Sequence, residues 1–170
     1  MIEIRKEEPD DVDSIRELNQ EAFGQAQEAE IVDKLRENCS DLLSLVAVVE
    51  NQVVGHILFS PALIEGEDRT LRGMALAPMA VLPDYQRQGI GSALVRDGIT
   101  RLADTPCPFV IVLGHAEYYP RFGFEPAGRH GIRSEWDVPD EVFMILVLDT
   151  ARVGGLSGTA RYRSEFSDTL

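Results

Sequence analysis

Lysines, cysteines and long apolar runs are all scarce in this sequence of 170 residues. Only Lys6 and Lys34 among the 16 basic residues are lysines, and 29 acidic residues bring the net charge to −13. Binding to nucleic acid or to an anionic membrane surface depends on positive charge, so we expect neither partner. Salt adaptation would explain the acidity, and a GC-rich genome would explain the preference for arginine over lysine.

The cysteines and the apolar segments indicate in which cellular compartment the protein is expected. Cys39 and Cys107 are too few for a disulfide framework, so we expect two partly buried thiols. The N-terminal segment has no apolar core of a signal peptide, and the apolar stretch over 42–49 is too short to cross a bilayer. The three histidines and two cysteines lack metal-ligand spacing. These absences predict a cytoplasmic protein without a bound metal.

Alternating and helical hydrophobic patterns follow one another along the chain. They predict the order β-α-α-β-β-β-α-β-α-β-β, which is typical of an α/β (α+β) fold with a mixed sheet. We expect one domain over residues 1–150, followed by a tail over 151–170 that is ordered against the domain or a neighbouring chain. Six of these seven strands are expected at about 2–5, 45–50, 53–60, 72–82, 109–113 and 142–148, and the four helices are expected at about 12–23, 28–35, 89–103 and 117–122.

Two local features refine this arrangement. Asn51-Gln52 separates two strand-like runs, which predicts a β-hairpin. Pro78 falls inside the strand expected over 72–82 and cannot donate a hydrogen bond to a neighbouring strand. We therefore expect a bulged, splayed central strand at this point.

The stretch over 79–94 carries the clearest chemical signal. A strand ends there, a turn with Gly89 and Gly91 follows, and a helix begins. Such a turn directs several backbone N–H groups to one point at the positive end of the helix, which favours a pyrophosphate. The stretch is not a dinucleotide fingerprint, because Leu94 stands where a third glycine or alanine is needed. By spacing alone, a plain strand-to-helix turn is an equal alternative.

The pattern Gln86-x-x-Gly89-x-Gly91 resembles the acetyl-coenzyme A signature of the GNAT superfamily of N-acetyltransferases. A second stretch, over 114–124, contains Tyr119 and resembles the tyrosine element of that superfamily, in particular of its YhbS-type branch. The resemblance covers residues 1–149 in the same order of elements. It implies a GNAT-like fold and an N-acetyltransferase domain over residues 1–150.

The resemblance also implies roles for individual residues. The backbone of Met79, Ala80 and Val81 is expected to meet the acetyl and pantetheine parts of acetyl-CoA, and Tyr119 is expected near the cofactor sulfur. A backbone N–H group, such as that of Met79, would stabilise the oxyanion. Tyr119 would donate a hydrogen bond to the departing thiolate. The pyrophosphate is expected on backbone N–H groups, with added charge from Arg87, over the residues Gln86, Arg87, Gln88, Gly89, Ile90, Gly91 and Ser92.

The reaction implied is direct attack of an amine on the thioester while both substrates are bound. An alkyl amine with a pKa of about 10.4 is almost fully protonated at neutral pH, so a base or a pocket that lowers this pKa is needed. His115 follows the buried strand over 109–113 and is the catalytic residue that we expect for this task. Glu117, Glu50 and His56 are alternatives, and a water chain would also serve.

We therefore expect an acetyltransferase that uses acetyl-CoA as co-substrate and acts on a primary amine of a small molecule or a protein. The alternative is an acyl-CoA-binding regulatory or interaction domain without catalysis, because no glutamate lies inside the 72–82 strand. A toxin that modifies aminoacyl-tRNA is a third reading, against which the negative charge argues. The acidic composition favours a cationic acceptor, and the chain is expected to be a monomer or a homodimer.

Overall fold

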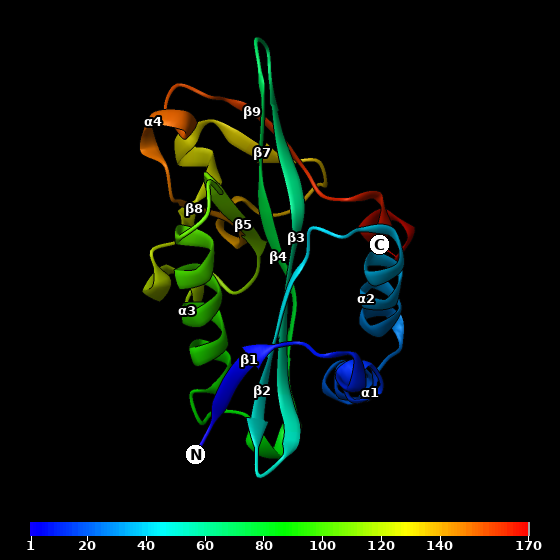
Figure 1. Cartoon of the computed structure of the whole chain (residues 1–170). Coiled ribbons are helices and arrows are strands. Elements are labelled where there is room, and N and C mark those ends of the chain that lie inside the picture. Colours follow the sequence, from blue (N-terminus) through cyan, green and yellow to red (C-terminus); the bar gives the residue numbers. More distant parts are fainter. Residues whose placement is uncertain (170) are drawn as a thin grey trace. The chain divides into compact units, whose positions relative to one another are not determined.

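Residues 1–169 are described by a computed structural model, in which the chain forms two compact units (Figure 1). The first unit contains residues 1–60 and 77–101 and the segment that starts at Ser164, and the second contains 61–76 and 102–163. Strands β3 (Gln52–Gly66) and β4 (Thr70–Val81) contribute residues to both units. The chain contains both helices and strands, and its strands pair in parallel and antiparallel fashion, which confirms the expected α/β class with a mixed sheet.

Three strands of the first unit pair in antiparallel fashion in the order β1-β2-β3. β1 (Glu3–Lys6) pairs with β2 (Leu43–Val49), and β2 pairs with β3. Glu50 and Asn51 connect β2 to β3 and have φ angles of 49° and 66°, as a two-residue hairpin with both central residues left-handed requires. The predicted hairpin is confirmed, and its turn lies one residue earlier than expected.

Helices cover both faces of this sheet. Figure 1 shows α1 (Val12–Phe23) and α2 (Gln27–Asn38) on one face and α3 (Ile90–Ala103) on the other. α1 ends where its C-cap, Gly24, adopts a left-handed φ of 68° and donates its N–H to the Gln20 carbonyl. The helices bury one apolar face each, and the fully buried side chains include Ile15, Leu18, Leu35, Ile90 and Leu94.

Glycine allows α3 to approach β3 closely. A Cβ atom at Gly98 would overlap the ring of Phe59, which is completely buried. A Cβ atom at Gly55 would come within 3.1 Å of the Ile90 and Leu94 side chains. The helix that begins at the glycine turn is therefore fixed to the sheet by close packing.

The second unit is built around β5 (Phe109–Leu113). β5 pairs in parallel with β4 at Met74↔Val110 and antiparallel with β8 (Phe143–Val147), and β8 pairs with the short β6 (Glu125–Pro126). Phe109 to Val112 are all buried, as the continuous apolar run predicted. The parallel strand pair expected across α3 is confirmed.

The second unit also corrects several sequence predictions. β3 continues to Gly66, beyond the expected end at residue 60, because Leu63–Gly66 pair with β9 (Gly158–Arg161). β9 in turn pairs in parallel with β7 (Ile132–Ser134), a strand too short to show a pattern in the sequence. The helix expected over 117–122 is a single 3₁₀ turn, Tyr119–Phe122, which ends at Gly123 with a φ of 97°.

Residues 150–162 also belong to the second unit. The four-residue helix α4 (Thr150–Val153) precedes β9, and Ala160 and Tyr162 are buried. The boundary at residue 150 between a domain and a tail stays a prediction.

Pro78 lies within β4 after a cis bond from Ala77. The predicted splaying of the strand at this point stays a prediction.

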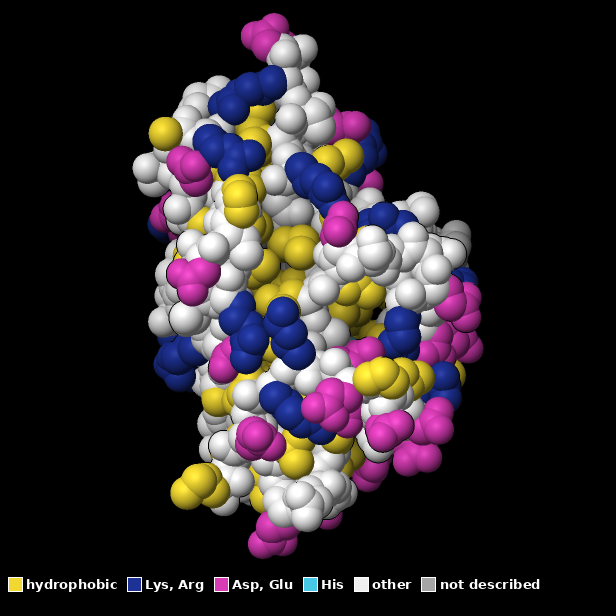
Figure 2. All heavy atoms as spheres, viewed as in Figure 1, with side chains coloured by type: hydrophobic (Ala, Val, Ile, Leu, Met, Phe, Trp, Pro, Cys, Tyr) yellow, Lys and Arg dark blue, Asp and Glu magenta, His cyan; other side chains and the backbone are white. Residues whose placement is uncertain are grey.

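Acidic side chains gather over α1 and α2 on the face that Figure 2 shows. Asp13, Glu17, Glu21, Glu30 and Glu37 on these two helices are all exposed. Part of the acidic excess is therefore a solvated helical surface. Within residues 1–169, no helix is both long and apolar enough to cross a membrane.

Candidate functional site

The connection between β4 and α3 in the first unit is held by its own hydrogen bonds. The Leu82 N–H donates to the Val54 carbonyl at 2.9 Å, which attaches the end of β4 to β3. The Tyr85 N–H donates to the Leu82 carbonyl at 2.8 Å within the 3₁₀ turn Pro83–Tyr85. The Gln86 side-chain amide donates to the Val81 carbonyl at 3.0 Å. Hydrogen bonds within the protein therefore fix the path of this connection without a ligand.

The segment that leads into α3 is exposed, and the first backbone N–H groups of the helix have no partner within the helix. Arg87 and Gly89 have positive φ angles of 63° and 84°, and residues 86–89 are exposed. The first hydrogen bond of the helix joins the Ala93 N–H to the Gly89 carbonyl at 3.0 Å. The N–H groups of Ile90 and Gly91 precede that bond, at the positive end of the helix. This geometry suits an anion such as a phosphate.

The residues expected at the cofactor lie in one continuous stretch of the first unit. Met79 and Val81 are half-buried on β4, and Ala80 between them is buried. The stretch continues through the 3₁₀ turn and ends in the first turn of α3. The ten expected residues all fall within segment 79–92 of the first unit, and their role stays a prediction: Met79, Ala80, Val81, Gln86, Arg87, Gln88, Gly89, Ile90, Gly91 and Ser92.

Tyr119 lies in the second unit, inside a group of aromatic rings. Its ring meets those of Tyr118 and Phe124 edge-on, with centroids 5.1 and 5.6 Å away. A Cβ atom at Gly114 would overlap the Tyr119 ring, so glycine is needed beside it. Only 7% of Tyr119 is exposed, and burial, together with the nearby Tyr118, raises the pKa of Tyr119 to about 12. The phenol is therefore a stable hydrogen-bond donor at neutral pH.

His115 and Glu117, in the same unit, are both exposed. The His115 carbonyl accepts the N–H groups of Tyr118 and Tyr119 at 3.0 and 3.4 Å, so its backbone holds the start of the tyrosine turn. Its imidazole is accessible from solvent. The role of His115 as a base stays a prediction.

His56 and Glu50 lie in the first unit and differ strongly in environment. Glu50 is exposed in the hairpin turn. His56 is completely buried, and its ring nitrogens lie 2.9 Å from Ser44 Oγ and 3.3 Å from Asn19 Nδ2. Burial lowers the pKa of His56 to about 4. A base for an external amine must meet that amine, so the structure assigns His56 to the packing of the first unit.

Tyr162, in the second unit, is a functional candidate that no sequence pattern indicated, whereas the polar loop around Trp136 makes that residue a candidate for lining the acceptor site from the sequence alone. Tyr162 is buried, and its N–H donates to Glu135 Oε1 at 3.3 Å. Burial, the Glu135 carboxylate and the Tyr119 phenol raise the pKa of Tyr162, so the two phenols are electrostatic neighbours. Trp136 packs on the Tyr162 ring with centroids 4.7 Å apart. The sequence separates these residues from Tyr119 by up to 43 positions, and no local pattern joins them.

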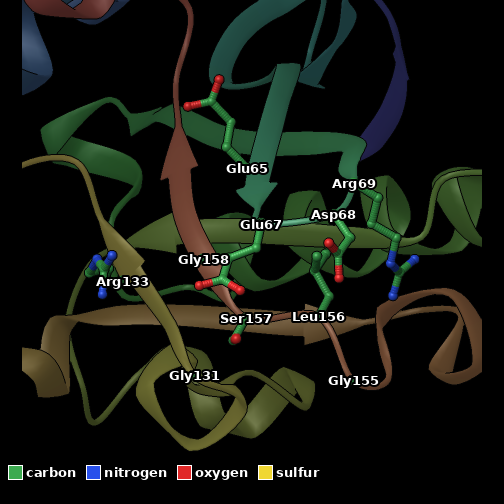
Figure 3. A pocket seen from close by; sticks show the side chains of 11 residues that line it. Glu65, Glu67, Asp68, Arg69, Gly131, Arg133, Gly155, Leu156, Ser157 and Gly158 are labelled. Atoms are coloured by element: carbon green, nitrogen blue, oxygen red, sulfur yellow. The ribbon is translucent and has the colours of Figure 1, made fainter.

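Two cavities are lined by described residues of the second unit. The larger measures about 500 Å³ and is lined by β3, β7 and β9, with Glu67, Asp68 and Arg69 at one side (Figure 3). The smaller measures about 320 Å³ and is lined by Trp136 and other residues of the 128–143 segment. Across residues 1–169, no three His, Cys, Asp or Glu side chains are grouped so as to hold a metal ion.

Comparison with curated proteins identifies related chains. A family model described as an acetyltransferase (GNAT) domain matches residues 3–127. The uncharacterized N-acetyltransferase YjhQ of Escherichia coli K12 is 46% identical over 134 residues, which cover 77% of this chain and 74% of YjhQ. The uncharacterized N-acetyltransferase YhbS of that strain is 36% identical over 165 residues, which cover 96% of this chain and 98% of YhbS.

Solved structures agree with these matches. The crystal structure of Escherichia coli YhbS in complex with CoA has a TM-score of 0.91 at 35% identity, covering 98% of this chain and 92% of that one. A GNAT family acetyltransferase from Brucella melitensis in complex with acetyl-CoA has a TM-score of 0.78 at 35% identity, covering 98% of each chain. The resemblance based on two sequence motifs is confirmed. By sequence and by fold, the chain therefore belongs to the GNAT family of N-acetyltransferases.

Proposed function

We propose that this chain transfers the acetyl group of acetyl-CoA to a primary amine by direct attack while both substrates are bound. The observation that carries the proposal is the exposed start of α3, where Arg87 and Gly89 adopt positive φ angles and backbone N–H groups precede the helix. The complexes of two relatives with CoA and acetyl-CoA support it. The proposed acceptor is a small molecule or an exposed amine of a protein.

The proposed cofactor contacts follow the continuous stretch in the first unit. Backbone N–H groups of residues 86–92 would hold the pyrophosphate, and the exposed Arg87 would add a positive charge. Gly89 would let a phosphate oxygen approach, since the space beside its Cα is open. Met79 and Val81 would offer backbone groups to the acetyl and pantetheine parts. Ala80, between them, is buried and would anchor the strand.

In the proposed reaction, the amine nitrogen attacks the thioester carbon and a tetrahedral oxyanion forms, which the Met79 N–H would stabilise. The carbon–sulfur bond then breaks, and the coenzyme leaves as a thiolate. A thiol has a pKa of about 8.5, whereas that of Tyr119 is about 12. Full proton transfer from Tyr119 would cost about 5 kcal/mol. Tyr119 would therefore donate a hydrogen bond to the thiolate, which takes its proton from solvent.

The acceptor amine must lose two protons in total, one before it attacks and one after the new bond forms. His115 is the proposed base, because its imidazole is exposed while its carbonyl holds the Tyr119 turn. The protons would pass from the nitrogen to the imidazole and on to water.

The test is release of the coenzyme thiol from acetyl-CoA in the presence of a panel of primary amines. We expect amine-dependent release, slowed at least about tenfold in Tyr119→Phe, with little change in the KM for acetyl-CoA. Phe122→Leu, in the same aromatic group, serves as a matched control for packing. Amine-independent release, or a full rate in Tyr119→Phe, would contradict the proposed role.

The alternative is a domain that binds acyl-CoA without catalysis. It is suggested by β4, whose sequence from Thr70 to Val81 contains no carboxylate that could act as a base. This alternative predicts acetyl-CoA binding without thiol release for every amine tested.

A further inference from the structure

The smaller cavity of the second unit has a distinct composition. It measures about 320 Å³, which is the lower end of the range for small-molecule sites. Its lining includes Trp136, Phe143, Asp137 and Asp140. We call it the Trp136 cavity. An indole, a phenyl ring and two carboxylates in one small space favour an organic cation over an anion.

The physical basis is the charge on each group. The face of an indole ring attracts an ammonium group, and the attraction grows as water is excluded. Asp137 and Asp140 add two negative charges, against one positive charge from Arg133 in the lining. Arg133 donates its Nε–H to Thr159 Oγ1 at 3.2 Å, which ties part of the guanidinium to β9. The lining is therefore net negative.

The indole is held in place before any ligand arrives. Its ring packs on the Tyr162 ring with centroids 4.7 Å apart and an interplanar angle of 41°, and the backbone N–H of Trp136 donates to Ser134 Oγ at 3.1 Å. Tyr162 is itself buried. A fixed aromatic surface reduces the entropy lost on binding.

The same contacts lead from the Trp136 cavity toward Tyr119. The Tyr162 ring carries Trp136, and the Tyr119 phenol is near enough to raise the pKa of Tyr162. All three aromatic residues belong to the second unit. Trp136 and Tyr162 thus link the Trp136 cavity to the tyrosine that we assign to the reaction.

We propose that the Trp136 cavity binds the positively charged end of the acceptor, which makes the substrate class an amine that carries a second positive charge. This inference rests on the proposed function, because the bound cation is an acceptor only if the chain transfers an acetyl group to it. The larger cavity does not suit the same ligand as well, because its lining contains no aromatic side chain. Its Glu67 instead provides a matched control, since it offers a carboxylate outside the Trp136 cavity.

Trp136 is the only tryptophan in the chain, so intrinsic fluorescence reports directly on this cavity. The experiment titrates putrescine, which is doubly cationic, and γ-aminobutyrate, in which a carboxylate replaces the second ammonium group. We expect a saturable change with putrescine at a midpoint at least about tenfold lower than with γ-aminobutyrate. The variant with Asp137→Asn and Asp140→Asn should raise the putrescine midpoint about tenfold, whereas Glu67→Gln should leave it unchanged.

Equal midpoints for the two probes, an unchanged midpoint in the double variant, or no saturable change would each overturn the inference. The measurement needs no turnover, so its outcome is separate from that of the proposed function. Failure of thiol release with intact putrescine binding would refute acetyl transfer and leave a cation site. Thiol release without any fluorescence response would refute the cavity alone.

Discussion

Acidification should destabilise this protein through His56, well above the pH at which most carboxylates titrate. His56 is completely buried in the first unit. Ser44 donates its hydroxyl proton to Glu7 at 2.6 Å, so it accepts from His56 Nε2 at 2.9 Å. The other ring nitrogen then accepts from the Asn19 amide at 3.3 Å. The neutral ring satisfies these partners, and a second ring proton would face an amide N–H.

The magnitude follows from the two pKa values. Burial lowers the pKa of His56 from 6.5 in the unfolded chain to about 4 in the folded one. Between these values the unfolded state binds a proton that the folded state does not, so folding stability falls as the pH falls. At about 1.4 kcal/mol for each pH unit, the loss from this group is roughly 3 kcal/mol, completed near pH 4. Above pH 6.5 the contribution is fully present.

The assay is urea unfolding at a series of pH values between 7.5 and 4, with His56→Gln as the test variant. His56→Gln should lower stability at neutral pH by about 1–3 kcal/mol through lost hydrogen bonds. It should also remove most of the pH dependence above pH 5. His115→Gln, at an exposed position, is the control. The same slope in His56→Gln and in the unmodified protein would refute the reasoning.

Two carboxylates, Glu7 and Asp11, change stability at lower pH than His56 does, so their effect can be distinguished from that of His56. The bidentate ion pair with Arg36 and the Ser44 hydrogen bond lower the pKa of Glu7 despite its burial. The Arg5 guanidinium lowers that of Asp11. Their stabilising effects are present above the usual carboxyl range and disappear below it. A steep loss confined to that lower range would therefore point to these ion pairs and away from His56.

Two further predictions concern packing and catalysis. Gly98→Ala should destabilise the protein by about 1–3 kcal/mol in urea unfolding, because the new methyl group would overlap the Phe59 ring; Gly128→Ala, where a Cβ meets open space, should have a far smaller effect. In a pH–rate profile of thiol release, kcat should not fall through Tyr119 ionisation up to about pH 10, because the pKa of Tyr119 is about 12. A decline with a midpoint near the ordinary tyrosine value would contradict the buried placement of this phenol.

The elements with strong local signals were predictable from the sequence. Helical spacing over 12–23, the Gly24 cap, the hairpin and the glycine turn before α3 all depend on residues close together in the chain. The pairing of β3 with β9 was missed, because strand partners distant in sequence leave no periodic signal.

The candidate site was likewise predictable only where its residues are close together in the sequence. The cofactor stretch is one continuous segment, so its residues could be named from their order alone. The position of Trp136 on Tyr162 depends on tertiary folding and was not predictable from spacing. Nor did the sequence reveal that burial would raise the pKa of Tyr119 to about 12, which favours hydrogen bonding over proton donation.

The central claim is that the start of α3 binds acetyl-CoA. A calorimetric titration of acetyl-CoA into the unmodified protein tests it directly, with Gly89→Val and Gly128→Val as a matched pair. Gly89 has a φ of 84°, which a β-branched residue does not readily adopt, whereas Gly128 has no such constraint. We predict saturable binding that Gly89→Val weakens at least about tenfold and Gly128→Val leaves intact. The absence of binding heat at millimolar acetyl-CoA, or equal affinity in Gly89→Val, would contradict the account.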